Sequence, residues 1–188
     1  MKLLNLEFQE KRIPLYGPGA KDEILKHSPA GKVPCLIDGV TTVWDSLAIL
    51  EYLAEKHRQL WPPDSTERAR ARSISAEMHA GFPNLRNRMC MNVRKRYPGK
   101  GRTPEVLLEV ERIKSIWSQA KKPFLFGSFT AADAMYAPVV LRFRTYEVEL
   151  PQPARAYADA VFALPAMKEW IAAAQHETET IPQFDLYE

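Results

Sequence analysis

A polar pair, Asp45-Ser46, stands directly before an apolar helical pattern that begins at Leu47. The Asp carboxylate is a hydrogen-bond acceptor, while the Ser hydroxyl and the free N–H groups of a helix N-terminus are donors that hold anions. Both residue types are also common helix caps, and capping is their more frequent use. The pair therefore predicts either a plain helix start or a site for a small polar molecule.

Upstream of this pair, Lys32 and Cys35 are two further side chains that could take part in chemistry. Lys32 is either a solvated turn lysine or the cation that meets an anionic ligand. A cysteine beside an apolar run is typically a small buried hydrophobe, and we assign Cys35 no catalytic role. Cys35 and Cys90 have no CxxC spacing and no neighbouring His ligands, so we expect neither a metal site nor a disulfide.

Short strand patterns alternate with helical ones in the first third of the chain. We expect strands over 8–15, 33–37 and 41–44, with a short helix over 21–27. The Asp38-Gly39 pair favours a tight hairpin turn between the last two strands. This alternation predicts a small α/β domain.

Trp61, Pro62 and Pro63 interrupt the pattern, and helical spacing dominates after them. The sequence predicts an α/β domain over 1–58, a linker over 59–65 and an all-helical domain over 66–188. We expect a long helix from Thr66 that kinks at Gly81 and Pro83, followed by helices over 103–119, 130–145, 154–164 and 165–178. In the helix over 103–119, the residues expected to face inward are Val106, Leu107, Val110, Ile113 and Trp117.

Composition excludes some classes of protein. The chain has 188 residues and a formal charge of +3, and no apolar run approaches the roughly 18 residues of a membrane-spanning helix. We expect a cytoplasmic protein that binds no membrane. The basic run over 86–102 is either a solvated face or a rim that attracts anions, and without an accompanying motif it does not predict nucleic-acid binding.

Two stretches resemble one family. The residues SPAGKVPCLID (28–38), followed by WDSLAILEYL (44–53), resemble the glutathione-binding half of glutathione transferases. The residues FGSFTAADAMYAP (126–138) resemble the signature of that family's helical half, in which Thr130 and Asp133 form a capping box. The resemblance implies a thioredoxin-like α/β N-terminal domain followed by an all-α helical-bundle C-terminal domain.

The resemblance also implies a glutathione site. The Val33-Pro34 peptide is expected to be cis, with the Val33 backbone pairing with the cysteinyl unit of glutathione. Asp45 and Ser46 are expected to hold the γ-glutamyl group, although the family has Glu where this chain has Asp. Lys32 is expected to pair with the glycyl carboxylate. Glutathione is thus the expected co-substrate, with no metal.

The beginning of the chain departs from the family pattern. Residues 1–7 resemble the last turns of a helix that follows a first strand, so the domain is expected to be incomplete. The family's thiol-activating Ser, Tyr or Cys precedes that helix and has no counterpart here. The catalytic residue is therefore unknown.

The implied activity is that of a detoxifying, homodimeric transferase in which the glutathione thiolate attacks a small electrophile. The alternative is a non-catalytic glutathione-binding or scaffold protein of the same fold. Met78, Phe82 and Met89 are candidates for the wall of the second-substrate pocket, although apolar residues at helical spacing are more often core.

Overall fold

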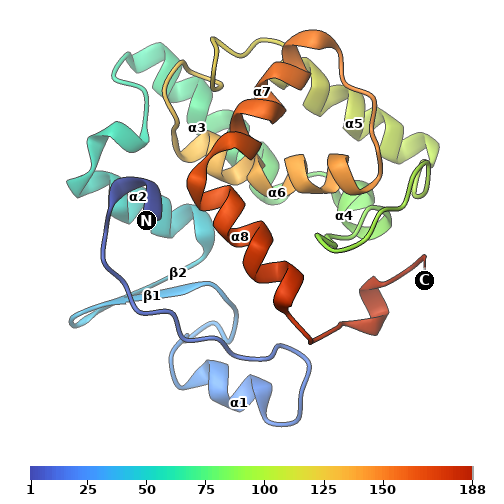
Figure 1. Cartoon of the computed structure of the whole chain (residues 1–188). Coiled ribbons are helices and arrows are strands. Elements are labelled where there is room, and N and C mark those ends of the chain that lie inside the picture. The colour runs from blue at the N-terminus through green and yellow to red at the C-terminus, as the bar shows by residue number, and fades with distance from the viewer. Residues whose placement is uncertain (188) are drawn as a thin grey trace. The chain divides into compact units, whose positions relative to one another are not determined.

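The computed structural model describes residues 1–187, and the chain divides into two compact units, Met1–Leu60 and Trp61–Glu188. The division falls inside the stretch 59–65 that the sequence assigns to a linker. The first unit contains a small sheet with helices, and the second is helical in its described part (Figure 1).

The first unit is built around a β-hairpin. Strands β1 (Cys35–Asp38) and β2 (Thr41–Trp44) are antiparallel, with Cys35 opposite Trp44 and Asp38 opposite Thr41. The loop is therefore Gly39-Val40, one residue later than predicted, because Asp38 still pairs. Gly39 has φ 60° whereas Val40 has no positive φ, which is the pattern of a type II′ turn.

The predicted strand over 8–15 is wrong. No regular structure forms over residues 6–14, and most of these residues are exposed. A strand requires a hydrogen-bonding partner, and in the described residues the sheet consists of β1 and β2 alone. Contact with the rest of the unit comes instead from Lys11, whose ammonium group donates to Glu23 at 2.7 Å.

Helices flank the hairpin along the chain. The predicted helix over 21–27 is confirmed as α1 (Ala20–Leu25), and the helix after the polar pair as α2 (Ser46–Lys56). Two short 3₁₀ turns complete the unit, η1 (Lys2–Leu4) and η2 (Arg58–Leu60). No residue of β1 or β2 is buried, so this unit has little core of its own.

The second unit contains six α-helices in its described part. Their bounds are α3 (Ser65–Ala80), α4 (Pro83–Arg88), α5 (Pro104–Trp117), α6 (Ala131–Thr145), α7 (Gln152–Ala163) and α8 (Pro165–His176), followed by the 3₁₀ turn η3 (Pro182–Phe184). The predicted helices are confirmed, but the expected kink is a break. Phe82 takes a left-handed conformation with φ 59°, and Pro83 begins a new helix.

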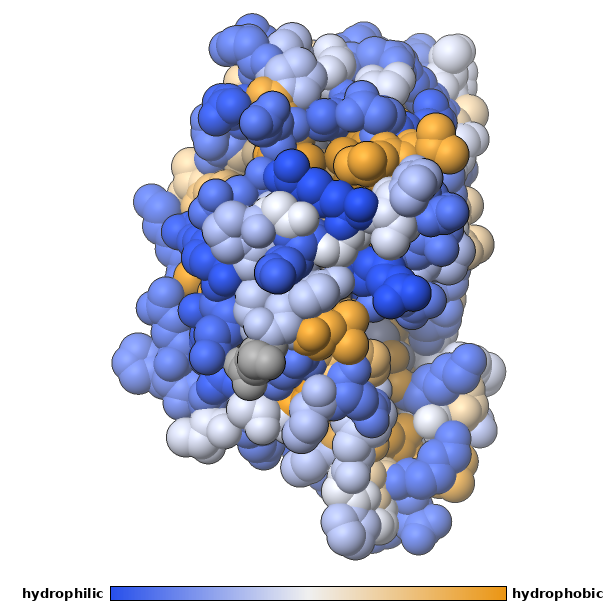
Figure 2. All heavy atoms as spheres, turned by 90° about the vertical axis from the view of Figure 1, so that its right-hand side faces the viewer, coloured by the Kyte–Doolittle hydropathy of each residue, from blue (hydrophilic) through white to orange (hydrophobic). Residues whose placement is uncertain are grey.

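The core of the second unit surrounds Trp117. This side chain is fully buried and contacts the rings of Tyr136, Phe143 and Tyr157, with centroid distances of 6.3, 5.0 and 5.1 Å. The predicted inward face of α5 is confirmed except at Leu107, which is 45% exposed because it lies about 100° around the helix from Val106. Figure 2 shows hydrophobic side chains as separate patches on a largely hydrophilic face.

Asp133 organises the start of α6. Its buried carboxylate accepts hydrogen bonds from the backbone N–H and the hydroxyl of Thr130, at 2.7 and 2.9 Å, and from the Leu125 N–H at 3.0 Å. The predicted capping box is confirmed. It joins the loop before the helix to the core of the helical unit.

Candidate functional site: the hairpin base and the start of α2

A tight turn precedes the Val33-Pro34 dipeptide. The Gly31 N–H donates to the Ser28 carbonyl oxygen at 2.8 Å, which closes a turn over Ser28–Gly31 with Pro29 at its favoured second position. The Lys21 ammonium group donates to the Gly31 carbonyl oxygen at 2.9 Å. No sequence pattern predicts this role of Lys21, although the glycine in the SPAGK stretch is a signal that the backbone needs an unusual conformation there.

The Val33–Pro34 peptide bond is cis, as the resemblance implies. Val33 is 48% exposed, and Lys32 and Pro34 are also exposed. Because β1 pairs with β2 along one edge, within the described residues its other edge has outward-facing backbone N–H and C=O groups without a strand beside them. The segment over 32–34 and the unpaired edge of β1 thus offer backbone groups to an extended ligand.

The hairpin register brings the two predicted parts of the site together. Cys35 lies opposite Trp44, so Pro34 and Asp45 follow at the same end of the two strands. This end carries the cis peptide on one side and the start of α2 on the other. Two segments eleven residues apart in sequence therefore meet at the base of the hairpin.

Asp45 is the N-cap of α2, and its Oδ1 accepts from the Leu47 N–H at 2.9 Å. The capping interpretation is thus confirmed. Its backbone, however, has φ 77° and ψ 130°, a region that non-glycine residues rarely adopt and that costs about 1–3 kcal/mol. Such strain is typical of functional sites. In the described part of the chain, the Ser46 hydroxyl has no hydrogen bond, so it is available to a ligand.

The charged groups around the turn are mutually paired. Glu23 in α1 contacts the ammonium groups of Lys11 and Lys26, each at 2.7 Å, and these two lysines lower its pKa to about 2. Lys11 also lies 2.8 Å from His27 Nε2. Lys32 is outside this cluster and exposed, which leaves the predicted pairing of Lys32 with a glycyl carboxylate a prediction.

The predicted wall residues of the second-substrate pocket lie in the core of the helical unit. Met78 is 3% exposed, Phe82 6% and Met89 0%. This burial matches the core interpretation that the sequence left open. Their contact with a second substrate stays a prediction.

Several arginines of the basic region bind backbone carbonyl oxygens. Arg86 donates to Met78 and to Gly81, and Arg94 donates to Glu177 and to Glu179 near the end of the chain. The guanidinium groups thereby satisfy helix ends and the tail. Arg86 and Arg94 thus have a structural role that the sequence did not predict.

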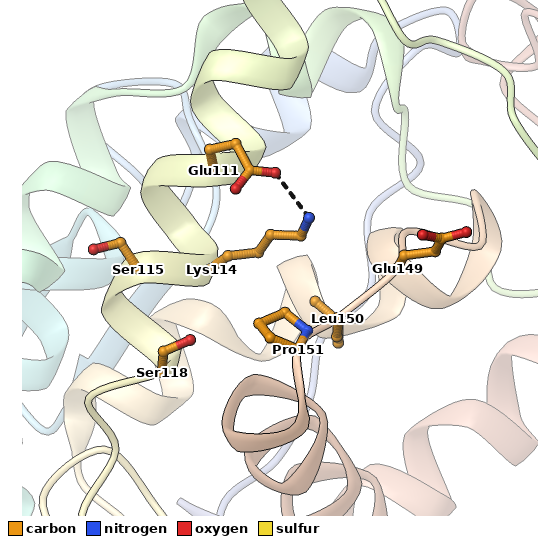
Figure 3. A pocket seen from close by; sticks show the side chains of 7 residues that line it. All are labelled: Glu111, Lys114, Ser115, Ser118, Glu149, Leu150 and Pro151. Carbon is orange, nitrogen blue, oxygen red and sulfur yellow. Dashed lines mark hydrogen bonds and ion pairs between the residues drawn. The ribbon is translucent and has the colours of Figure 1, made fainter.

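A separate pocket of about 550 Å³ lies on the helical unit, between α5 and the segment before α7 (Figure 3). Figure 3 shows Lys114 directed toward Glu111, and their side chains are 2.8 Å apart. The remaining lining residues are Ser115, Ser118, Glu149, Leu150 and Pro151. Because Lys114 is already paired and none of the predicted site residues lies here, we assign this pocket no role.

Two further findings concern metal binding and membrane insertion. Within residues 1–187, no group of three or more His, Cys, Asp or Glu side chains has the arrangement of a metal site. Likewise, none of the helices in this range has the length and hydrophobicity that crossing a membrane requires.

Comparisons with known proteins agree with this geometry. Residues 1–56 match the glutathione S-transferase N-terminal domain, and residues 106–173 match the glutathione S-transferase C-terminal domain. Maleylacetoacetate isomerase of Rattus norvegicus is 31% identical over 162 residues, which cover 81% of this chain and 73% of the rat protein. A Caenorhabditis elegans protein named "Probable maleylacetoacetate isomerase" is 27% identical over 161 residues, covering 81% and 75% of the two chains.

Solved structures show the same fold. A glutathione transferase homolog from Burkholderia, determined with bound glutathione, aligns with a TM-score of 0.69 at 22% identity, covering 92% of this chain and 85% of the other. The α/β unit is therefore thioredoxin-like, and the helical unit is the helical domain that accompanies it. The chain belongs to the glutathione S-transferase family. The family and the fold class that the sequence predicted are confirmed.

Proposed function

We propose that the chain binds glutathione at the base of the hairpin and belongs to a glutathione-dependent enzyme. The observation that carries this proposal is the meeting of the exposed Val33 backbone with the Asp45-Ser46 helix start at one end of the hairpin. The Val33 backbone pairs with the cysteinyl unit of the tripeptide. Asp45 accepts from the γ-glutamyl ammonium group, and Ser46 donates to the γ-glutamyl carboxylate together with the N–H groups of α2.

In the proposed reaction, the glutathione thiol loses its proton and the thiolate forms a C–S bond with an electrophilic carbon. That carbon either expels a leaving group with its bonding electron pair, or gives up the π electron pair of a double bond, which then takes up a proton. We assign no residue of this chain to activation of the thiol. We also propose that the protein is a homodimer, that it is cytoplasmic and that its second substrate is a small electrophile.

A glutathione-dependent isomerisation is the second candidate, because two relatives that align with most of the chain carry the name maleylacetoacetate isomerase. Addition of the thiolate to a double bond, followed by its elimination, changes the geometry of the substrate and returns glutathione unchanged. Consumption of glutathione during turnover separates conjugation from isomerisation. Binding without turnover supports the non-catalytic alternative.

The test uses a matched pair of serines. Asp64 and Ser65 begin α3 as Asp45 and Ser46 begin α2, and Asp64 Oδ1 accepts from the Glu67 N–H at 2.8 Å. Replacing Ser46 with Ala should raise the Kd for glutathione about tenfold, the value of one hydrogen bond to a charged group. Ser65→Ala should leave it unchanged.

Isothermal titration calorimetry measures both values, and thermal unfolding checks that each variant is folded. Absence of glutathione binding by the unaltered chain, or equal Kd values for the two Ala variants, would contradict the proposed site.

A further inference from the structure

Lys21 connects the first turn of α1 to the end of the Ser28–Gly31 turn. Its Nζ donates to the Gly31 carbonyl oxygen at 2.9 Å, and within residues 1–187 this oxygen is its hydrogen-bond partner. That carbonyl belongs to the peptide unit between Gly31 and Lys32. Because a peptide unit is planar, holding its oxygen also fixes the direction of the Lys32 N–H and the path of the chain toward Val33.

Gly31 is shaped to receive the Lys21 side chain. Its φ is +59°, in the left-handed region, and the residue is buried. A Cβ atom at this position would lie 2.3 Å from Lys21 Nζ and 2.8 Å from Lys21 Cε. The lysine side chain therefore occupies the space that any side chain at position 31 would need.

Hydrogen bonds also hold the two ends of the segment over 28–35. The Ser28 N–H donates to the Ile24 carbonyl oxygen at 2.8 Å, and the Cys35 thiol donates to the His27 carbonyl oxygen at 3.3 Å. Lys21 adds a bond from α1 to the stretch between these ends. This stretch leads directly to Val33, whose exposed backbone the proposed site uses.

We propose that Lys21 is a positioning residue for glutathione, acting through Gly31 on the backbone of Lys32 and Val33. This inference rests on the proposed function. Lys21 makes no contact with the ligand in this account. Its ammonium group orders the segment before glutathione arrives, so binding does not have to order it.

The first test replaces Lys21 with Met, which keeps an unbranched side chain one atom shorter and removes the donor. The Kd for glutathione should rise about threefold to tenfold, as expected for the loss of one hydrogen bond. Lys21→Arg, which keeps a donor, should restore most of the affinity. Lys26→Met removes a lysine from the end of the same helix and should change the Kd less than twofold.

A second test uses the close approach at Gly31. Gly31→Ala should weaken glutathione binding at least tenfold, because the new Cβ displaces Lys21 and the φ of +59° is unfavourable for alanine. In a Lys21→Ala background the first cause is absent. The same Gly31→Ala change should then cost less, and a double-mutant cycle gives the difference.

Hydrogen exchange of the ligand-free protein tests the inference without glutathione. In Lys21→Met, the Gly31 amide, whose N–H donates to the Ser28 carbonyl oxygen at 2.8 Å, should exchange about threefold to tenfold faster, while the amides of α2 keep their wild-type rates. Unchanged exchange at Gly31 would overturn the positioning role, as would a Kd for Lys21→Met equal to that of the wild type. Failure of the wild-type chain to bind glutathione, with the exchange effect intact, would refute the proposed function and with it the glutathione role of Lys21, and would leave Lys21 as an anchor of the Gly31 backbone.

Discussion

The two units begin a helix with the same dipeptide, and they do so differently. Asp64 in the helical unit has an ordinary extended backbone, with φ −68° and ψ 135°. Asp45 in the α/β unit has φ 77° at the end of a hairpin whose strands contain no buried residue. Asp64 is a plain helix cap in a well-packed unit, while Asp45 combines a strained backbone with an open surface. The difference supports the proposal that glutathione binds to the α/β unit, while the helical unit contains the larger buried core.

The largest expected effect is on the free energy of unfolding, and it compares a valine-to-alanine substitution in each unit. Val110 is 2% exposed in α5, whereas Val43 in β2 is only half-buried. Val110→Ala should lower the free energy of unfolding by about 2–3 kcal/mol through lost burial and a cavity. Val43→Ala should cost less than about 1 kcal/mol. Chemical denaturation followed by circular dichroism measures both, and equal losses would break the contrast between the units.

A smaller effect separates the two aspartates. Asp45→Gly should raise stability by about 1 kcal/mol, because glycine relieves the positive φ and loses only a few tenths as a cap. The same variant should weaken glutathione binding at least tenfold, since the carboxylate is lost. Asp64→Gly should lose a few tenths of a kcal/mol and bind glutathione normally. If Asp45→Gly is destabilising, the backbone of Asp45 is not strained.

The smallest effect is the pH dependence of the α/β unit. Lys11 and Lys26 lower the pKa of Glu23 from 4.5 to about 2, so the ion pairs stabilise the folded unit above pH 4.5. This contribution is lost as the pH falls from 4.5 toward 2. Because the group is exposed, salt should weaken the effect. NMR of α1 amides should report the transition, and Glu23→Gln should abolish it; a transition that persists in this variant has another cause.

The sequence predicted the parts of the fold that local patterns determine. The apolar spacing of α5, the Thr130 and Asp133 capping box, and the hairpin near Gly39 follow from residues that are close together in the chain. The strand expected over 8–15 failed because strand formation depends on a partner elsewhere, which alternation of residue types cannot show. The expected burial of Leu107 is wrong for a related reason, since helical spacing alone does not define how wide the buried face is.

The candidate site was also predictable only in part. The Val33-Pro34 and Asp45-Ser46 pairs were found by resemblance, and the hairpin register explains why they lie at one end of the sheet. The bond from Lys21 to Gly31 was missed, because a lysine in an exposed first turn is an ordinary feature of sequence. The positive φ of Asp45 could not be predicted from the sequence either, since aspartate is also a common residue of unstrained helix caps.

Mapping the binding of glutathione residue by residue tests the proposed site most directly. Adding glutathione to the isotope-labelled chain should shift the NMR signals of the amides over 31–33 and 45–48 in a saturable way. Amides over 111–118, beside the pocket on the helical unit, should not move. Saturable shifts confined to 111–118, or none in either region at millimolar glutathione, would contradict the assignment of the glutathione site to the base of the hairpin.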